Sequence, residues 1–146
     1  MFRGAPMDYA GFWRRFVAYL IDYLVVLAGS VAVGFAIGFV AGLTGSEDVN
    51  GAWLAAIYIA VIAGYYLYYA FMESSANQAT VGKIALGIKV TDLEGNRISF
   101  GRALGRSLAK IISAVILLIG YLMAAFTERK QALHDKIAGT LVVKRA

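Results

Sequence analysis

The sequence predicts a mainly helical membrane protein with a small β element, and composition and patterning carry that prediction. Apolar residues make up 60% of the 146 residues and charged residues only 16%, a balance outside the range of soluble domains. The apolar residues gather in three stretches, Phe16–Leu43, Gly51–Met72 and Ile111–Thr127. The first two are long enough to cross a bilayer as helices. We expect transmembrane helices over about 13–43 and about 51–72, within one domain that covers 1–146.

The charge pattern predicts an orientation for these helices. The N-terminal tail and the polar segment at about 73–106 are basic, whereas the loop between the two helices contains Glu47 and Asp48 but neither Lys nor Arg. Basic segments stay on the cytoplasmic side of a membrane. We therefore expect a multi-pass protein of the bacterial cytoplasmic (inner) membrane with its N-terminus in the cytoplasm.

The third apolar segment, at about 107–127, leaves two arrangements open. Its uncharged run is at the lower limit for a span, and it is followed by a basic tail, 128–146. A third span would place that tail outside. A re-entrant hairpin that turns at Leu117–Gly120 would keep both termini in the cytoplasm, and re-entrant backbone is tolerated where protein buries it. The charges favour the hairpin.

Three short β-prone runs predict a small cytoplasmic sheet. The runs Ile88–Thr91 and Arg97–Ser99 flank a Gly/Asn turn and are typical of a hairpin. The run Thr140–Lys144 is a third strand candidate. Because an isolated hairpin is marginally stable, we expect the three runs to form one sheet.

Asp22 is the only charged residue within Phe16–Leu43. A carboxylate inside a membrane helix costs about 2.5–3.5 kcal/mol on insertion scales, so we expect it to face protein or water with a partner. Arg15 precedes it by seven residues, which places both on one helix face about 10 Å apart along the axis. We interpret Arg15 and Asp22 as a coupled pair.

Two further sets of residues are candidates for recognition. Arg102, Arg106 and Lys110 recur every four residues on one expected helix face. They could bind anionic lipid headgroups, neutralise Asp22, or only snorkel to the interface.

Small residues recur every four positions in the first helix, and such rows allow close helix packing. The row could pack against helix two of the same chain, which we favour, or in a homo-oligomer. The members of this row are Ser30, Gly34, Gly38 and Gly42.

The composition argues against several classes of function. The chain has no cysteine and one histidine, which makes a metal site improbable. We find no nucleotide-binding loop and no nucleophile with a base. We therefore expect no cofactor, no nucleic-acid partner and no enzymatic activity.

The chain resembles the RDD family of small bacterial integral membrane proteins in three blocks. These are Tyr9–Asp22, with the run Trp13-Arg14-Arg15, then Thr80–Val90, with Gly82-Lys83, and finally Leu133–Val143, with His134-Asp135. The resemblance implies that the family's arginine and two aspartates correspond to Arg15, Asp22 and Asp135. It departs at Val81 and near Val115, where proline is common in the family. Members have been linked to sodium–proton exchange and to protection against antimicrobial peptides.

Two functions therefore stay open. One is cation/proton exchange, with Asp22 as the site for protons or monovalent cations and Arg15 tuning it. Two or three spans cannot enclose a pathway, so this function requires an oligomer. The other is a non-transporting accessory or protective module that binds a protein, peptide or lipid, with Arg15–Asp22 as a structural lock. Few polar groups occur at mid-membrane positions, which favours the module or a transporter that needs a partner.

Overall fold

Two long helices dominate the structure. A computed structural model of the chain describes residues 7–44, 51–116 and 119–145. Helix α1 covers Phe12–Thr44 and helix α2 covers Gly51–Ser74. Both are long and apolar enough to cross a membrane, and they are the two such helices in the described part of the chain. The predicted helices agree with them to within about two residues.

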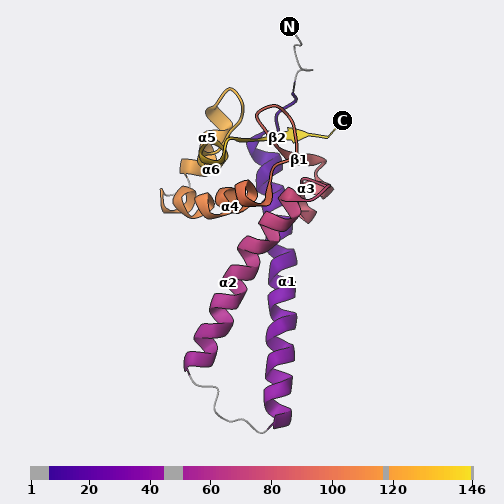
Figure 1. Ribbon diagram of the computed structural model, residues 1–146, viewed down its shortest axis with the longest axis vertical. Coiled ribbons are helices and arrows are strands. Elements are labelled where there is room, and N and C mark those ends of the chain that lie inside the picture. The colour runs from indigo at the N-terminus through magenta and orange to yellow at the C-terminus, as the bar shows by residue number, and fades with distance from the viewer. Residues whose placement is uncertain (1–6, 45–50, 117–118, 146) are drawn as a thin grey trace.

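The remaining elements gather at one end of α1 and α2, and we call them the head (Figure 1). They are α3 Val81–Ala85, β1 Ile88–Asp92, α4 Phe100–Val115, α5 Ile119–Phe126, α6 Leu133–Ala138 and β2 Thr140–Lys144. Small alanines, among them Ala10, Ala18 and Ala103, pack with Ile88 and Val142 in the core of the head. Small side chains let the elements approach closely around the first turns of α1.

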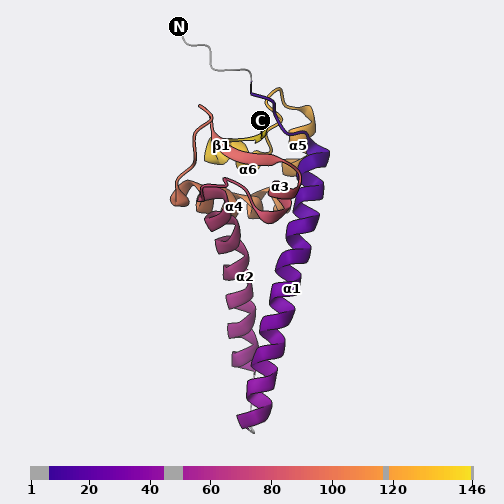
Figure 2. The same cartoon turned by 90° about the vertical axis from the view of Figure 1, so that its right-hand side faces the viewer.

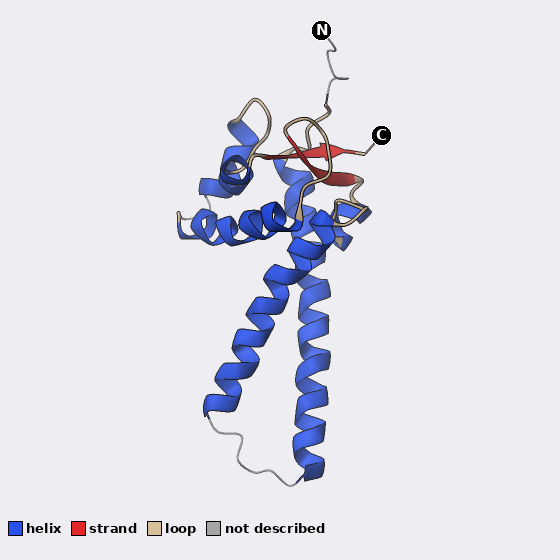
Figure 3. Ribbon diagram, in the orientation of Figure 1, coloured by secondary structure: helices blue, strands red, loops and turns tan. Residues whose placement is uncertain are grey.

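The sheet differs from the predicted one. β1 and β2 are antiparallel, with Val90 opposite Val142, and they are the strands drawn in red in Figure 3. Arg97–Ser99 does not join them. Ser99 instead caps α4, its Oγ accepting a hydrogen bond from the Arg102 backbone N–H at 3.3 Å. The other edge of β2 is covered by the segment before α1, where the Ala10 N–H donates to the Val142 carbonyl at 2.9 Å.

Within the described residues the third apolar segment forms two helices, α4 and α5, and neither is among the candidate membrane spans. In both views α4 lies across the head end of α1 and α2 (Figures 1 and 2). α5 then packs back on α4, because a Cβ built on Gly120 would lie 2.9 Å from the Cα of Ser113. The two helices fold back on each other within the head and do not run alongside α1 and α2, while the re-entry of this segment into a membrane stays a prediction. The expected turn falls partly on Leu117–Leu118, outside the described residues.

The row of small residues in α1 does not pack against α2 in the described structure, which corrects our expectation. A Cβ built on Gly34, Gly38 or Gly42 meets no atom within 4 Å. Away from the head the two helices diverge (Figure 1). The Ser30 hydroxyl donates to the carbonyl of Val26, one turn earlier, at 2.9 Å. Nothing in the described chain therefore explains the row.

Candidate functional site

A network of buried charges joins the two long helices to the head. Four basic and two acidic side chains from α1, α2, α3, α4 and α6 take part, all of them less than about one-seventh exposed. The members are Arg15, Glu73, Lys83, Arg106, Lys110 and Asp135. We call these six residues the charge network.

Arg106 is the centre of the charge network. Its side chain is 2% exposed, and its fork contacts two carboxylates. Nε and Nη2 donate to Oδ1 of Asp135 at 3.0 and 2.7 Å, while Nη1 donates to Glu73. A planar guanidinium suits such double recognition. Burial works against the charge of Arg106, yet the two carboxylates raise its pKa above the ordinary value.

Asp135 lies at the start of α6 and binds two arginines. Besides Arg106, it accepts a hydrogen bond from Nη1 of Arg15, and its Oδ2 caps α6 by accepting from the Ala132 N–H at 3.0 Å. Burial acts to raise the pKa of this carboxyl, but Arg15 and Arg106 hold it well below the usual value. Asp135 is thus a fixed anion that ties α1, α4 and α6 together.

Glu73 is the member that sequence reasoning missed. It is fully buried near the end of α2 and pairs with Lys83 of α3 and with Arg106. Nζ of Lys110 lies 3.9 Å from it. One signal was available in the sequence, since Glu73 directly follows the uncharged run of the second helix. Lys83 was noticed only as part of the family pattern.

Asp22 is held by neutral donors, which corrects the predicted pair with Arg15. The Tyr68 hydroxyl, the Thr80 hydroxyl and the Gly82 backbone N–H donate to its carboxylate at 3.0, 2.5 and 2.7 Å. Among described residues it makes no salt bridge. Arg15 lies two helical turns from Asp22, about 10 Å along the axis. The guanidinium of Arg15 instead forms a salt bridge with Asp135.

The close docking of α3 against α1 makes this arrangement possible. A Cβ built on Gly82 would lie 2.0 Å from the carbonyl oxygen of Ala18, so only glycine allows the approach. The same approach brings the Gly82 N–H to Asp22. Thr80 lies just before α3 and adds its hydroxyl.

The expected basic face of α4 is not a surface stripe. Arg102 is exposed, but Arg106 and Lys110 are buried. α4 turns this face inward, where Arg106 and Lys110 meet Glu73 and Asp135, so these two residues form no exposed stripe at the surface. Neither buried residue pairs with Asp22.

His134 lies next to the charge network and is neutral. Its Nδ1 is 3.3 Å from the Ser113 hydroxyl, and its ring centroid is 5.1 Å from that of Tyr121. Burial lowers the pKa of His134 to about 3, although Asp135 acts in the opposite direction. The histidine therefore works as a packed, hydrogen-bonded side chain at neutral pH.

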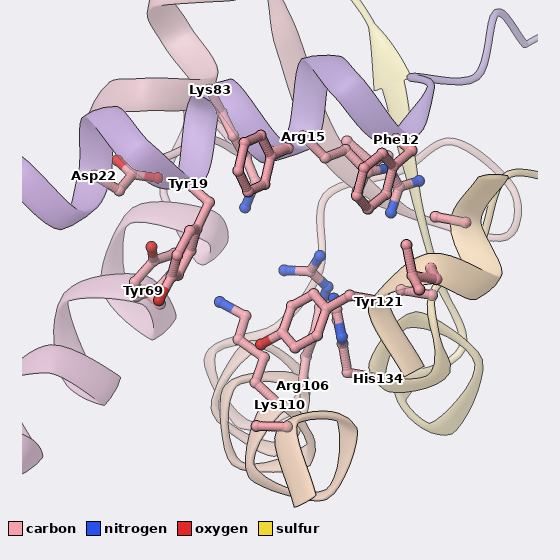
Figure 4. Close-up of a pocket in the computed structure, with 16 residues that line it drawn as sticks. Phe12, Arg15, Tyr19, Asp22, Tyr69, Lys83, Arg106, Lys110, Tyr121 and His134 are labelled. Atoms are coloured by element: carbon pink, nitrogen blue, oxygen red, sulfur yellow. The ribbon is translucent and has the colours of Figure 1, made fainter. Parts of the chain in front are cut away.

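A cavity of about 300 Å³ lies between α1 and the helices of the head. Figure 4 shows Arg15, Lys83, Arg106 and Lys110 around it, with aromatic rings between them. Asp22 is the acidic residue of its wall. In the described part of the chain, no group of His, Cys, Asp and Glu side chains could hold a metal ion. The chemistry of the cavity is that of buried cations beside apolar surface.

Comparison with known proteins places the chain among membrane proteins of one family. The RDD family pattern matches residues 9–139. The chain is 39% identical to the uncharacterized protein YxaI of Bacillus subtilis (strain 168), over 92% of this chain and 96% of that protein. It is 32% identical to the uncharacterized membrane protein YteJ of the same organism, over 92% and 80%. A Haemophilus influenzae protein is 31% identical over 98% and 83%. No solved structure matches the chain.

Proposed function

This chain belongs to the RDD family of membrane-associated proteins, and we propose that it is a membrane-anchored binding module rather than an autonomous transporter. The observation that supports this proposal is the position of the charges. The charge network lies entirely in and beside the head, whereas α1 carries no charged residue after Asp22. A transporter needs polar groups along its path through the bilayer.

The length of α1 supports a position of Asp22 near the edge of the bilayer. α1 has 33 residues, a rise of about 50 Å, whereas the hydrocarbon core is about 30 Å thick and takes about 20 residues. If the apolar end spans the core, about 13 residues of α1 lie on the head side. Asp22 is the eleventh residue of α1 and falls among them. Beyond it, the hydroxyl of Ser30 is already bound to its own helix.

We also propose that the head lies in the cytoplasm of a bacterium, because its loops and the N-terminal tail are basic. The chain has no cysteine, so single cysteines at the exposed positions Asn96 and Arg129 report on sidedness. These positions flank α4 and α5. In sealed cells, neither should react with an impermeant maleimide. Reaction of Arg129→Cys alone would reveal a third crossing.

The proposal is tested by flux measurements on purified protein in vesicles. With sodium, potassium and lithium gradients and a pH-sensitive dye inside, we expect no cation-driven proton movement above that of empty vesicles. The mass of the detergent-solubilised particle, corrected for bound detergent, is measured on the same sample. A monomer without flux supports the binding module, while flux would overturn it.

One observation favours proton-coupled transport as a second candidate. Asp22 is buried without an ion pair among the described residues, and a buried carboxylate in a membrane helix is a candidate site for protons or cations. Transport through Asp22 would require an oligomer that provides the rest of the path. In that case a folded Asp22→Asn protein loses the flux, because an amide does not exchange protons near neutral pH, and Asp22→Glu retains part of it.

A further inference from the structure

The cavity in the head holds more positive than negative charge. Arg15, Lys83, Arg106 and Lys110 all line it, and among the described residues their salt-bridge partners are Glu73 and Asp135. The carboxylate of Asp22 also lines the cavity and adds a third negative charge, but it accepts hydrogen bonds from three neutral donors and makes no salt bridge with the described cations. A buried charge without a partner is costly. Four cations therefore face three carboxylates, which leaves room for one more anion.

Two cationic groups at this cavity have N–H donors without a hydrogen-bond acceptor among the described residues. Nζ of Lys110 makes no hydrogen bond within the described residues. It lies 3.9 Å from Glu73 and 3.4 Å from the centre of the Tyr69 ring. Nη2 of Arg15 is buried without a partner in the same described part of the chain. Burial also lowers the pKa of Lys110 well below its usual value, as expected for a lysine whose counter-ion is missing.

Three cationic side chains from two elements converge at this cavity. In Figure 4 the side chains of Lys83, Arg106 and Lys110 point toward one another from α3 and α4, with Tyr69 and Tyr121 beside them. All three cations contact Glu73 from the same region. Preorganised cations of this kind suit an oxyanion with several oxygens, such as a phosphate or carboxylate.

The rest of the wall is apolar and reaches the surface beside α1. Phe12 and Phe16 of α1 and Leu122 of α5 line the cavity, and Phe16 and Leu122 are 42% and 43% exposed. Trp13, which packs edge-on against Phe12 and Phe16, is 73% exposed and is typical of a membrane interface. The apolar side of the cavity thus opens where the first turns of α1 meet the bilayer edge.

We propose that this cavity binds the anionic headgroup, phosphate or carboxylate, of an amphiphile whose apolar chain leaves past Phe16 and Leu122. The proposal rests on the binding-module function and names its ligand. The volume of about 300 Å³ is at the lower end for ligand sites, which suits a headgroup and the first part of a chain. Lys110 donates to the headgroup, and the positive charges of Lys83 and Arg106 beside it attract the headgroup.

The experiment uses the 146-residue chain in neutral maltoside micelles. Dodecyl phosphate is compared with two probes that each lack one of its features. Dodecyl phosphate carries both headgroup and chain, inorganic phosphate carries the headgroup charge alone, and dodecylphosphocholine carries the same chain with a zwitterionic head. Binding is followed by calorimetry and by the ligand-dependent rise in melting temperature. We expect dodecyl phosphate to bind more tightly than either of the other two probes.

Lys110→Met tests the site, with Arg102→Met as the matched control on the same helix. Methionine keeps most of the length of the lysine chain and removes the surplus charge, so the unliganded variant should be at least as stable as the parent. It should bind dodecyl phosphate roughly 10- to 100-fold more weakly, the loss expected for a hydrogen bond to a charged group. Arg102 is exposed, and its variant should bind like the parent.

A bulky Leu122→Trp variant tests the apolar side of the cavity. It should weaken dodecyl phosphate binding, while the weaker binding of inorganic phosphate stays unchanged.

Three results would overturn the proposal. One is equal binding of dodecyl phosphate and dodecylphosphocholine, which would remove the anionic requirement. Another is inorganic phosphate binding as tightly as dodecyl phosphate, which would remove the chain. The third is undiminished dodecyl phosphate binding by Lys110→Met. None of these three results would overturn the proposed binding-module function. That function is overturned by cation-driven proton flux in vesicles.

Discussion

The two aspartates that the family resemblance singled out are buried in opposite ways. Asp22 is surrounded by hydroxyls and one backbone N–H, whereas Asp135 is paired with Arg15 and Arg106. The first arrangement joins α1 to α2 and to the start of α3. The second is one part of the charge network, in which removing a charge leaves another one buried and unpaired. The comparison therefore predicts a large difference in what each carboxylate contributes to stability.

The largest effect should follow the loss of Arg106, which serves two carboxylates at once. Arg106→Gln leaves Glu73 and Asp135 without their shared cation, so we expect it to lower the free energy of unfolding by about 3–5 kcal/mol. Guanidinium titration in neutral micelles measures this. The control is Arg102→Gln on the same helix, which is exposed and should change stability by no more than about 0.5 kcal/mol. Equal effects of the two variants would remove Arg106 from the centre of the network.

The direct comparison is between Asp135→Asn and Asp22→Asn. Asp135→Asn leaves the Arg15 and Arg106 side chains partly unpaired, and we expect a loss of about 3 kcal/mol or more. Asp22→Asn keeps an acceptor for some of its neutral donors and should cost only about 1–2 kcal/mol. Both variants are measured by the same guanidinium titration at neutral pH. A larger loss for Asp22→Asn would show that neutral donors hold a carboxylate more strongly than the arginines do.

The sequence predicted the parts of this fold that depend on neighbouring residues. The spans follow from apolar runs of sufficient length, and both appear as α1 and α2. The strand at Thr140–Lys144 is also confirmed, because its β-branched residues favour a buried strand. The expected strand at Arg97–Ser99 failed because Ser99 is a helix cap, a role that the same residues also permit.

The pairings within the site could not be predicted in the same way. Helical spacing gives the neighbours of Arg15 on its own helix, but its partner Asp135 is 120 residues away in sequence. The family resemblance named Arg15, Asp22 and Asp135 without saying which of them touch. Glu73 was overlooked because it stands at the boundary between an apolar run and a polar segment, where a solvated side chain is the usual expectation.

His134 makes the stability of the head sensitive to acid, with a smaller effect. Its pKa is about 3 in the folded protein, below the ordinary value of about 6.5. As the pH falls below 6.5, the unfolded chain takes up a proton that the folded chain does not. Stability is therefore lost progressively between about pH 6.5 and 3, by about 1.4 kcal/mol at pH 5.5.

His134→Asn should remove this part of the acid dependence. The measurement compares guanidinium titrations of the parent and the variant at pH 8 and pH 5.5. The stability difference between the two pH values should be about 1.4 kcal/mol smaller in the variant, whatever the asparagine itself costs at pH 8. A parent and variant with the same pH dependence would mean that the imidazole of His134 titrates normally in the folded state.

The smallest effect is the most informative about how the two aspartates differ. The spacing of Arg15 and Asp22 alone predicts a coupled pair, in which a double variant recovers part of what each single variant loses. In the structure Arg15 pairs with Asp135 and Asp22 accepts from neutral donors. A double-mutant cycle of Arg15→Gln and Asp22→Asn should therefore be additive to within about 0.5 kcal/mol. The parallel cycle of Arg15→Gln and Asp135→Asn should show coupling of about 0.5–3 kcal/mol, because each single variant strands the partner's charge. Recovery in the first cycle and additivity in the second would instead restore Asp22 as the partner of Arg15.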